Sequence, residues 1–206
     1  MGPVMGAPNY HDWGCGSREW SNNCTLSNTR SKEHAWAEIA ISSVRALLEY
    51  VEVKGKVLDC CGANEDTVGT VLSAHGATLS TNDLDPRITA DTHLDASTEA
   101  FRHHFMVAGH RPDWVVTSPP YSNAFDILKS AIHVSLVGVA LKLRLQFLEP
   151  TKRRGQWLRE HPPSRIVVLP RATYRGRESC AAEVWLVWLA ERDDAHGRGE
   201  LFFDPR

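Results

Sequence analysis

Short apolar segments alternate with segments of helical period along most of this chain, and this alternation limits the class of fold. The apolar segments, which we expect to be strands, are residues 56–61, 77–81, 93–95, 114–117, 137–143, 165–169 and 184–189. The segments of helical period are residues 31–51, 66–75, 97–107, 123–134 and 152–160. Strands that alternate with helices form a mostly parallel sheet with helices on both faces. The sequence therefore predicts an α/β fold.

The last two predicted strands, 165–169 and 184–189, have no helix between them. We expect them to form an antiparallel C-terminal hairpin at one edge of a seven-stranded, mostly parallel sheet. A chain of 206 residues suits one domain with a full hydrophobic core, which we place in residues 31–206. Residues 1–30 and the final dozen residues look loosely organised, and the first segment, with Trp13 and Trp20, is a candidate flap over the functional site.

The composition is that of a globular protein, with 42% apolar and 23% charged residues. No apolar run approaches the roughly 20 residues that a membrane helix requires. The first residues have neither the basic start nor the apolar core of a secretory signal. We expect a soluble intracellular protein, cytoplasmic or nuclear.

Five cysteines are present, at positions 15, 24, 60, 61 and 180. Cys60 and Cys61 end an apolar strand, so we expect buried free thiols there. Cys15 and Cys24 lie near two histidines, but the irregular spacing lacks the paired cysteines typical of zinc sites. We therefore predict no metal site.

Positive charge is concentrated in residues 142–177, where ten Lys and Arg stand against two acids, although the whole chain has a net charge of −2. A local basic face on an acidic protein favours a polyanionic partner. A solvated face with scattered arginines is the alternative, and composition does not separate the two.

Polar residues collect where the predicted strands end. In an open α/β sheet, ligands bind beyond the carboxyl ends of the strands. The first strand runs into Asp59-Cys60-Cys61-Gly62-Ala63, in which Gly62 permits close approach of a ligand to the backbone. This loop lacks the glycines of a dinucleotide fingerprint, and its acids favour a cationic ligand. A single glycine after a strand is also common in sites without a ligand.

Asp83 follows the second strand, roughly 20 residues beyond the first loop, where a carboxylate can accept the hydroxyl groups of a ribose. The alternative is an Asx turn before Pro86. Together the two loops predict a nucleoside cofactor.

Ser118-Pro119-Pro120-Tyr121 follows the strand at 114–117, and the prolines end it because they cannot donate to a sheet ladder. The turn holds the Ser118 side chain and the Pro119 carbonyl as two rigid acceptors beside an aromatic ring. Acceptors of this kind can bind both hydrogens of a planar amino group and direct the nitrogen lone pair towards an electrophile. Tyr121 can stack on a flipped base. The alternative is a rigid surface turn.

The segment Thr117 to Tyr121 resembles the catalytic motif of S-adenosylmethionine-dependent amino-methyltransferases, (Asp/Asn/Ser)-Pro-Pro-(Tyr/Phe/Trp). The resemblance extends from about residue 56 to 189 and is strongest to a compact phage- or prophage-type branch of DNA methyltransferases. It implies a Rossmann-like class I methyltransferase fold and S-adenosylmethionine as cofactor. The residues it assigns to the cofactor are Asp59, Cys60, Gly62, Ala63, Asp83, Leu84, Asp95 and Ser118. Those it assigns to catalysis are Ser118, Pro119, Pro120 and Tyr121.

The implied reaction is methylation of an exocyclic amino group in DNA, at N6 of adenine or N4 of cytosine. Ser118 stands where adenine enzymes favour Asp or Asn and cytosine enzymes favour Ser, so the base stays open. RNA, a protein amide and a non-catalytic partner subunit are alternatives, the last because the cofactor loop has one glycine rather than a pair. The residues we expect to contact nucleic acid are Arg144, Lys152, Arg153, Arg154, Arg171, Arg175 and Arg177.

Overall fold

The computed structural model describes residues 29–63, 67–107, 109–171, 173–174, 177–178, 181–190 and 200–203. Several predictions lie outside these residues. They are the flap with Trp13 and Trp20, the positions of Cys15, Cys24 and Cys180, and the contact role of Arg175.

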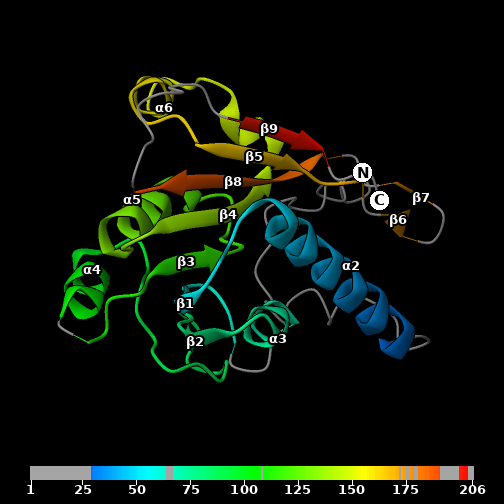
Figure 1. The fold of residues 1–206 in the computed structure, drawn as a ribbon, viewed down its shortest axis with the longest axis horizontal. Helices are drawn as coiled ribbons and strands as arrows, with labels where there is room; N and C mark the ends of the chain where they lie inside the picture. Colours follow the sequence, from blue (N-terminus) through cyan, green and yellow to red (C-terminus); the bar gives the residue numbers. More distant parts are fainter. Residues whose placement is uncertain are drawn as a thin grey trace, which may run out of the picture.

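The centre of the molecule is a seven-stranded sheet in the order β2-β1-β3-β4-β8-β5-β9 (Figure 1). The strands are β1 (Gly55–Asp59), β2 (Ala77–Thr81), β3 (Trp114–Thr117), β4 (Gly138–Arg144), β5 (Arg165–Val168), β8 (Glu183–Leu189) and β9 (Glu200–Phe203). Two short strands, β6 (Thr173–Tyr174) and β7 (Arg177–Glu178), form a separate hairpin. The prediction of a mixed α/β fold with a mostly parallel sheet is confirmed.

Only β8 runs against the other strands of the large sheet. The neighbours β2, β1, β3 and β4 pair in parallel. β8 pairs antiparallel with β4 on one side and with β5 on the other, and β9 pairs parallel with β5. The antiparallel C-terminal pair is therefore present, but β9 forms the edge of the sheet.

Six of the seven predicted strands are present, and β9 brings the large sheet to seven strands. The predicted strand at 93–95 was wrong, since only an isolated bridge joins Thr92 to Asn82 there. The Asn82 side chain forms hydrogen bonds with both the amide and the carbonyl of Leu94. These bonds stand in place of the backbone hydrogen bonds to a neighbouring strand. β9 lies in the final dozen residues, which the sequence pattern left without structure.

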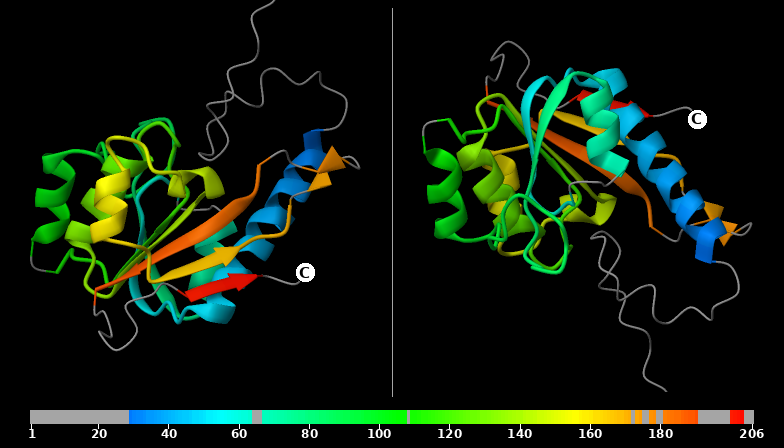
Figure 2. Two further views of the ribbon diagram at one scale, coloured as in Figure 1. Left: turned by 90° about the horizontal axis from the view of Figure 1, so that it is seen from above. Right: turned by 90° about the horizontal axis from the view of Figure 1, so that it is seen from below.

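Helices cover both faces of the sheet (Figures 1 and 2). Their bounds are α2 (Thr29–Tyr50), α3 (Thr67–Ala74), α4 (Glu99–Met106), α5 (Ala124–Val134) and α6 (Gly155–Glu160), with a 3-10 turn η1 (Leu145–Leu148) after β4. One core cluster packs α4 and α5 against the sheet, with Trp157 of α6 at its border. A second cluster packs α2 and α3 against the other face. The five predicted helices are confirmed, with ends shifted by up to three residues.

Trp185 of β8 shows how a helix is fixed on the sheet. Its ring is fully buried, and its Nε1 donates to the carbonyl of Ser43 in α2 at 2.7 Å. A buried indole N–H needs an acceptor, so this bond fixes where α2 crosses the sheet. None of the helices in the described part of the chain has the length and apolar character needed to cross a bilayer.

Candidate active site

The polar residues predicted to gather at one edge do so. Since β2, β1, β3 and β4 are parallel neighbours, their carboxyl ends lie side by side (Figure 1). Asp59 ends β1, Asn82 and Asp83 follow β2, Ser118 follows β3, and Arg144 ends β4. This edge is the candidate site.

Asp59 is the most buried acid at the edge, with 3% of its surface exposed. Its Oδ1 accepts a 2.6 Å hydrogen bond from Thr117 Oγ1 and a 3.1 Å bond from the Cys61 amide. The Thr117 bond joins the β1 loop directly to the strand that carries the Ser-Pro-Pro-Tyr turn. The carboxylate therefore couples the predicted cofactor loop to the predicted catalytic loop.

Gly62 has a steric reason to be glycine besides its predicted contact with the cofactor, which stays a prediction. A Cβ on Gly62 would lie 2.3 Å from Asp59 Oδ2 and 2.4 Å from Asp59 Cγ. Its φ lies outside the left-handed region, so the backbone does not require glycine. Glycine is needed here because the Asp59 carboxylate occupies the space of a side chain.

Asn82, which the sequence reading did not assign to the site, holds the neighbouring loops together. It is fully buried, and its Nδ2 donates to the carbonyls of Cys60 and Leu94 at 3.0 and 2.9 Å. Its Oδ1 accepts from Thr92 Oγ1 at 2.8 Å and from the Leu94 amide at 2.9 Å. One amide thus joins the end of β1 to the segment that leads to Asp95.

The Asx turn weighed as the alternative role of Asp83 is present, because the Asp85 amide donates to Asp83 Oδ1 at 2.8 Å. A carboxylate has about four acceptor positions, so this bond is compatible with further acceptance at the same group. Leu84, the next residue, is 64% exposed. A large exposed apolar side chain beside a carboxylate suits a ligand with a flat ring and hydroxyl groups.

Asp95 caps the turn that leads into α4. Its Oδ1 accepts from the amide and the hydroxyl of Ser97 at 2.9 and 2.7 Å. Its carbonyl accepts from Thr98, which caps α4. The residue lies on the predicted edge, and its assignment to the cofactor stays a prediction.

Cys60 and Cys61 form no disulfide bond within the described residues, and Cys60 is buried as expected whereas Cys61 is half-buried. Cys60 has 1% of its surface exposed. Its backbone carbonyl accepts a hydrogen bond from the Asn82 side chain. A hydrogen bond with Cys60 and burial raise the pKa of the Cys61 thiol well above its usual value. Ala63 is half-buried at the end of the same loop.

The turn after β3 has the rigid form that its prolines predict. Pro119 is buried, and the Asn123 amide donates to the Pro120 carbonyl at 3.1 Å, which closes the turn before α5. Within the described residues, the Ser118 side chain makes no hydrogen bond with the protein, and it is half-buried. Its hydroxyl oxygen is thus an acceptor with capacity for a ligand.

Tyr121 is held by residues that sequence reasoning did not connect to it. Its hydroxyl donates to Glu183 Oε1 at 3.3 Å, and Arg144 Cζ lies 4.5 Å from the centre of its ring. Burial and the charge of Glu183 raise the pKa of Tyr121 to about 12, against the opposing effect of Arg144. The phenol is therefore neutral at physiological pH.

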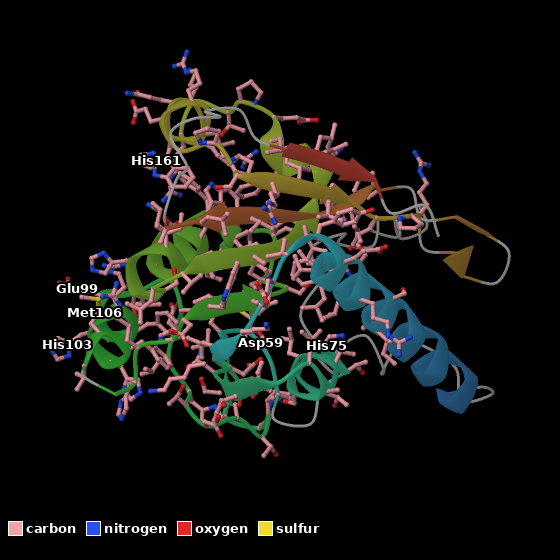
Figure 3. All side chains as sticks on the ribbon, viewed as in Figure 1. Asp59, His75, Glu99, His103, Met106 and His161 are labelled. Carbon is pink, nitrogen blue, oxygen red and sulfur yellow. The ribbon has the colours of Figure 1, made fainter. Side chains whose placement is uncertain are left out.

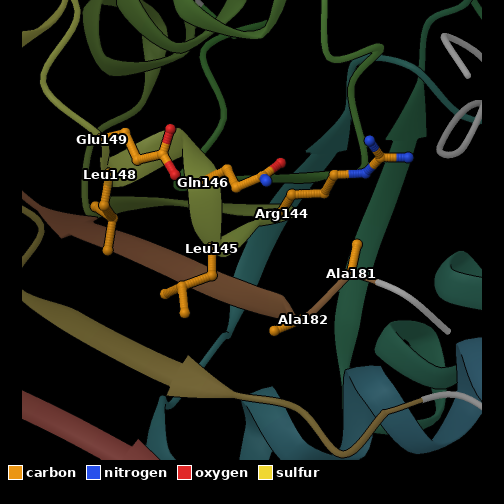
Figure 4. A pocket seen from close by; sticks show the side chains of 7 residues that line it. All are labelled: Arg144, Leu145, Gln146, Leu148, Glu149, Ala181 and Ala182. Carbon is orange, nitrogen blue, oxygen red and sulfur yellow. The ribbon is translucent and has the colours of Figure 1, made fainter. Parts of the chain in front are cut away.

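A pocket of about 400 Å³ opens where β4 ends and β8 begins (Figure 4). Arg144, whose guanidinium covers the Tyr121 ring, is one of the residues that line it. Arg144 lies at one end of it and Leu148 and Glu149 at the other (Figure 4). The residues that line it are Arg144, Leu145, Gln146, Leu148, Glu149, Ala181 and Ala182. The pocket offers apolar walls and a few polar groups, as small-molecule sites do.

Some of the predicted nucleic-acid residues contact other residues of the protein, and others expose their side chains. Arg153 pairs with Asp126 at 2.7 Å, and Arg154 donates to the carbonyls of Gln146 and Glu149. Burial lowers the pKa of Arg154. Arg144 packs on an aromatic ring, as described above. Lys152 and Arg171 are exposed, and for Arg177 the structure gives the backbone of β7 alone. Their contacts with nucleic acid stay predictions.

No group of three His, Cys, Asp or Glu side chains in the described part of the chain is arranged to hold a metal ion. Figure 3 shows Asp59 near the centre of the molecule, whereas Glu99, His103 and Met106 lie together on α4 at its periphery.

No protein-family model matches the chain, and no curated protein sequence does. Solved structures do match. A protein assigned as a class I S-adenosylmethionine-dependent methyltransferase from Listeria monocytogenes has 11% identity and a TM-score of 0.56, over 90% of this chain and 68% of that one. Magnesium protoporphyrin IX methyltransferase from Synechocystis has 12% identity and a TM-score of 0.50, over 84% and 89%. A protein assigned as a hemolysin from Lactococcus lactis has 14% identity and a TM-score of 0.50, over 80% and 91%.

At these identities the likeness concerns the fold. The chain has the fold of class I methyltransferases, as its resemblance to the amino-methyltransferases implied.

Proposed function

We propose that this chain is an S-adenosylmethionine-dependent methyltransferase that modifies the exocyclic amino group of a base in DNA. The observation that carries the proposal is the position of Ser118-Pro119-Pro120-Tyr121. The turn follows β3, and the Thr117–Asp59 bond joins it to the loop after β1. In open α/β sheets this edge is where ligands bind.

The residues along the edge fit the cofactor. Asp83 has acceptor positions for ribose hydroxyls, Leu84 offers an exposed apolar surface to an adenine ring, and Asp95 lies on the next loop. Asp59 places a buried negative charge under the first loop. A sulfonium carries positive charge, so this acid favours it electrostatically. When bound, S-adenosylmethionine supplies an electrophilic methyl group.

Residues of the chain itself bind and orient the amino group. Ser118 Oγ and the Pro119 carbonyl accept hydrogen bonds from the two amino hydrogens, which draws the nitrogen lone pair out of conjugation with the ring. The two acceptors direct that lone pair towards the methyl group that bound S-adenosylmethionine would supply, whose transfer to nitrogen would leave the electrons of the C–S bond on sulfur. The methylated nitrogen then loses a proton to water. No strong base is required, since alkylation makes that proton acidic.

Charge supports a nucleic-acid substrate. Residues 142–177 contain ten Lys and Arg against two acids, and Lys152 and Arg171 expose their side chains. Such residues bind phosphates without reading sequence. Ser118 at the first motif position is compatible with N4 of cytosine and with N6 of adenine. DNA is the proposed substrate, and RNA and a protein amide are the other substrates to include in the assay.

Two variants test the division of roles. Tyr121→Ala removes the ring on which the base stacks, so we expect methyl transfer to collapse while the affinity for S-adenosylmethionine is nearly unchanged. Asp83→Ala removes the acceptor for the ribose, so we expect it to weaken cofactor binding first. Calorimetric titration of the cofactor and a radiolabel transfer assay measure the two effects. Equal loss of both by either change would contradict these roles.

A further inference from the structure

The hydroxyl group of Tyr121 reaches a residue far away in the sequence. Its Oη donates to Oε1 of Glu183, the first residue of β8, at 3.3 Å. β8 is the strand that runs against its neighbours, so its first residue lies at the same edge as the last residue of β4. The reversal of one strand thus brings a carboxylate to the carboxyl edge of the sheet.

A cation on β4 holds that carboxylate. Lys142 Nζ lies 3.1 Å from Glu183 Oε2, and the two side chains are 16% and 27% exposed. Arg144, not Lys142, stands directly opposite Glu183 in the ladder. The Lys142–Glu183 ion pair therefore runs diagonally across the two strands. The Arg144 guanidinium lies over the Tyr121 ring instead. The diagonal pair leaves each oxygen of Glu183 with one partner.

These contacts fix the ring of Tyr121 on several sides. Glu183 holds its hydroxyl, Arg144 covers one face, and part of the ring packs against the core cluster that includes Leu141 and Val184. The ring also follows two prolines, which restrict the backbone before it. A stacking ring needs a fixed plane, because small misplacement of reacting groups costs large factors in rate.

We propose that Glu183 is a positioning residue for methyl transfer: with Lys142 behind it, it holds the plane of Tyr121 so that a stacked base meets the Ser118 and Pro119 acceptors. This role rests on the proposed function. Glu183 acts through Tyr121 and is not expected to touch the base.

Four variants separate positioning from a general structural role. Glu183→Gln keeps an acceptor oxygen for the phenol and removes the charge. Glu183→Ala removes the acceptor, and Tyr121→Phe removes the donor. Glu160→Ala is the control, since Glu160 is an exposed acid on α6 whose bond is to Gln156.

The first measurement needs no activity. The ultraviolet absorbance of the phenols is titrated with alkali, and the difference between the wild type and Tyr121→Phe isolates the signal of Tyr121. We expect Tyr121 to titrate at a lower pH in Glu183→Gln than in the wild type, since the charge of Glu183 opposes phenolate formation. An unchanged titration would show that the two groups do not interact and would overturn the proposal.

The second measurement is methyl transfer to DNA. We expect Glu183→Ala and Tyr121→Phe each to lower kcat by roughly 10- to 100-fold. The loss of kcat in the double variant should not exceed the larger of the two single losses, because both changes remove the same bond. Glu183→Gln should recover most of kcat, and Glu160→Ala should match the wild type, all with unchanged cofactor affinity.

An active wild type with an unimpaired Glu183→Ala variant, or independent losses that multiply in the double variant, would overturn the positioning role alone. A wild type that transfers no methyl group to any nucleic acid would overturn the proposed function and with it this role. The titration would then still report whether Glu183 and Tyr121 interact.

Discussion

Replacement of Gly62 by alanine tests how the first loop is built. The new Cβ would lie 2.3 Å from Asp59 Oδ2, well inside van der Waals contact. The carboxylate cannot simply turn away, because it is 3% exposed and its other oxygen is bonded to Thr117 and to the Cys61 amide. Either the loop shifts or the Thr117 bond breaks.

Both routes cost stability. Overpacking of a buried site costs about 1–3 kcal/mol, and a hydrogen bond to a charged group is worth about 1.5–3 kcal/mol. We therefore expect Gly62→Ala to lower the free energy of unfolding by about 1–3 kcal/mol by either route. Urea unfolding followed by circular dichroism measures the change, and calorimetry should show weaker binding of S-adenosylmethionine.

A double-variant cycle identifies the cause. In the Asp59→Ala background the atoms that clash are gone, so Gly62→Ala should cost less than about 0.5 kcal/mol there. Gly76→Ala is the matched control: Gly76 has φ +88° with open space around it, so its cost is conformational, about 1–2 kcal/mol, and independent of Asp59. A Gly62→Ala cost that is equal in both backgrounds would refute the steric explanation.

Three further predictions concern stability. Asn82→Ala removes hydrogen bonds to the Cys60 carbonyl, to Thr92 Oγ1 and to the amide and carbonyl of Leu94, so we expect a loss of about 3 kcal/mol in urea unfolding, against less than about 0.5 kcal/mol for Asn123→Ala, whose side chain makes no capping bond. Gly138→Ala would place a Cβ 2.6 Å from the buried ring of Trp114, and we expect a loss of about 1–3 kcal/mol by thermal unfolding. Because the pKa of Tyr121 is raised to about 12, the folded protein keeps a proton that the unfolded chain loses near pH 10. Its contribution to stability is thus complete below pH 10 and is lost as the pH rises towards 12, and Tyr121→Phe should remove that part of the pH dependence.

The parts of the fold that the sequence predicted best are those bounded by glycine or proline residues that end a helix or a strand. β2 and β3 begin and end where predicted, because Gly76 precedes β2 and the prolines at 119 and 120 follow β3. β9 was missed because a four-residue edge strand has a short pattern, and what makes it a strand is its pairing with β5. The error at 93–95 has a similar cause, since Asn82 holds that segment from another part of the chain.

The site shows the same division. Local chemistry predicted that Asp59, Asp83 and the Ser118 turn lie at one edge, which parallel strands guarantee, whereas Asp95 follows a segment that the Asn82 side chain holds. The roles of Glu183 and Asn82 depend on partners 62 and up to 22 residues away, and no local signal marks such pairs. Arg154, predicted from its position in the chain to contact nucleic acid, donates to the carbonyls of Gln146 and Glu149 in its own loop, which its position did not indicate, and its contact with nucleic acid stays a prediction.

The most direct test of the account is transfer of labelled methyl from S-adenosylmethionine to duplex DNA, single-stranded DNA, RNA and a glutamine-containing peptide, followed by mass spectrometry of the products. The account predicts label in N4-methylcytosine or N6-methyladenine from DNA, and its loss in Tyr121→Ala. Label in RNA or in the peptide alone would keep the chemistry and contradict the substrate. Confirmed cofactor binding without transfer to any of the four would contradict the proposed reaction, and a wild-type protein that does not bind S-adenosylmethionine would contradict the central claim.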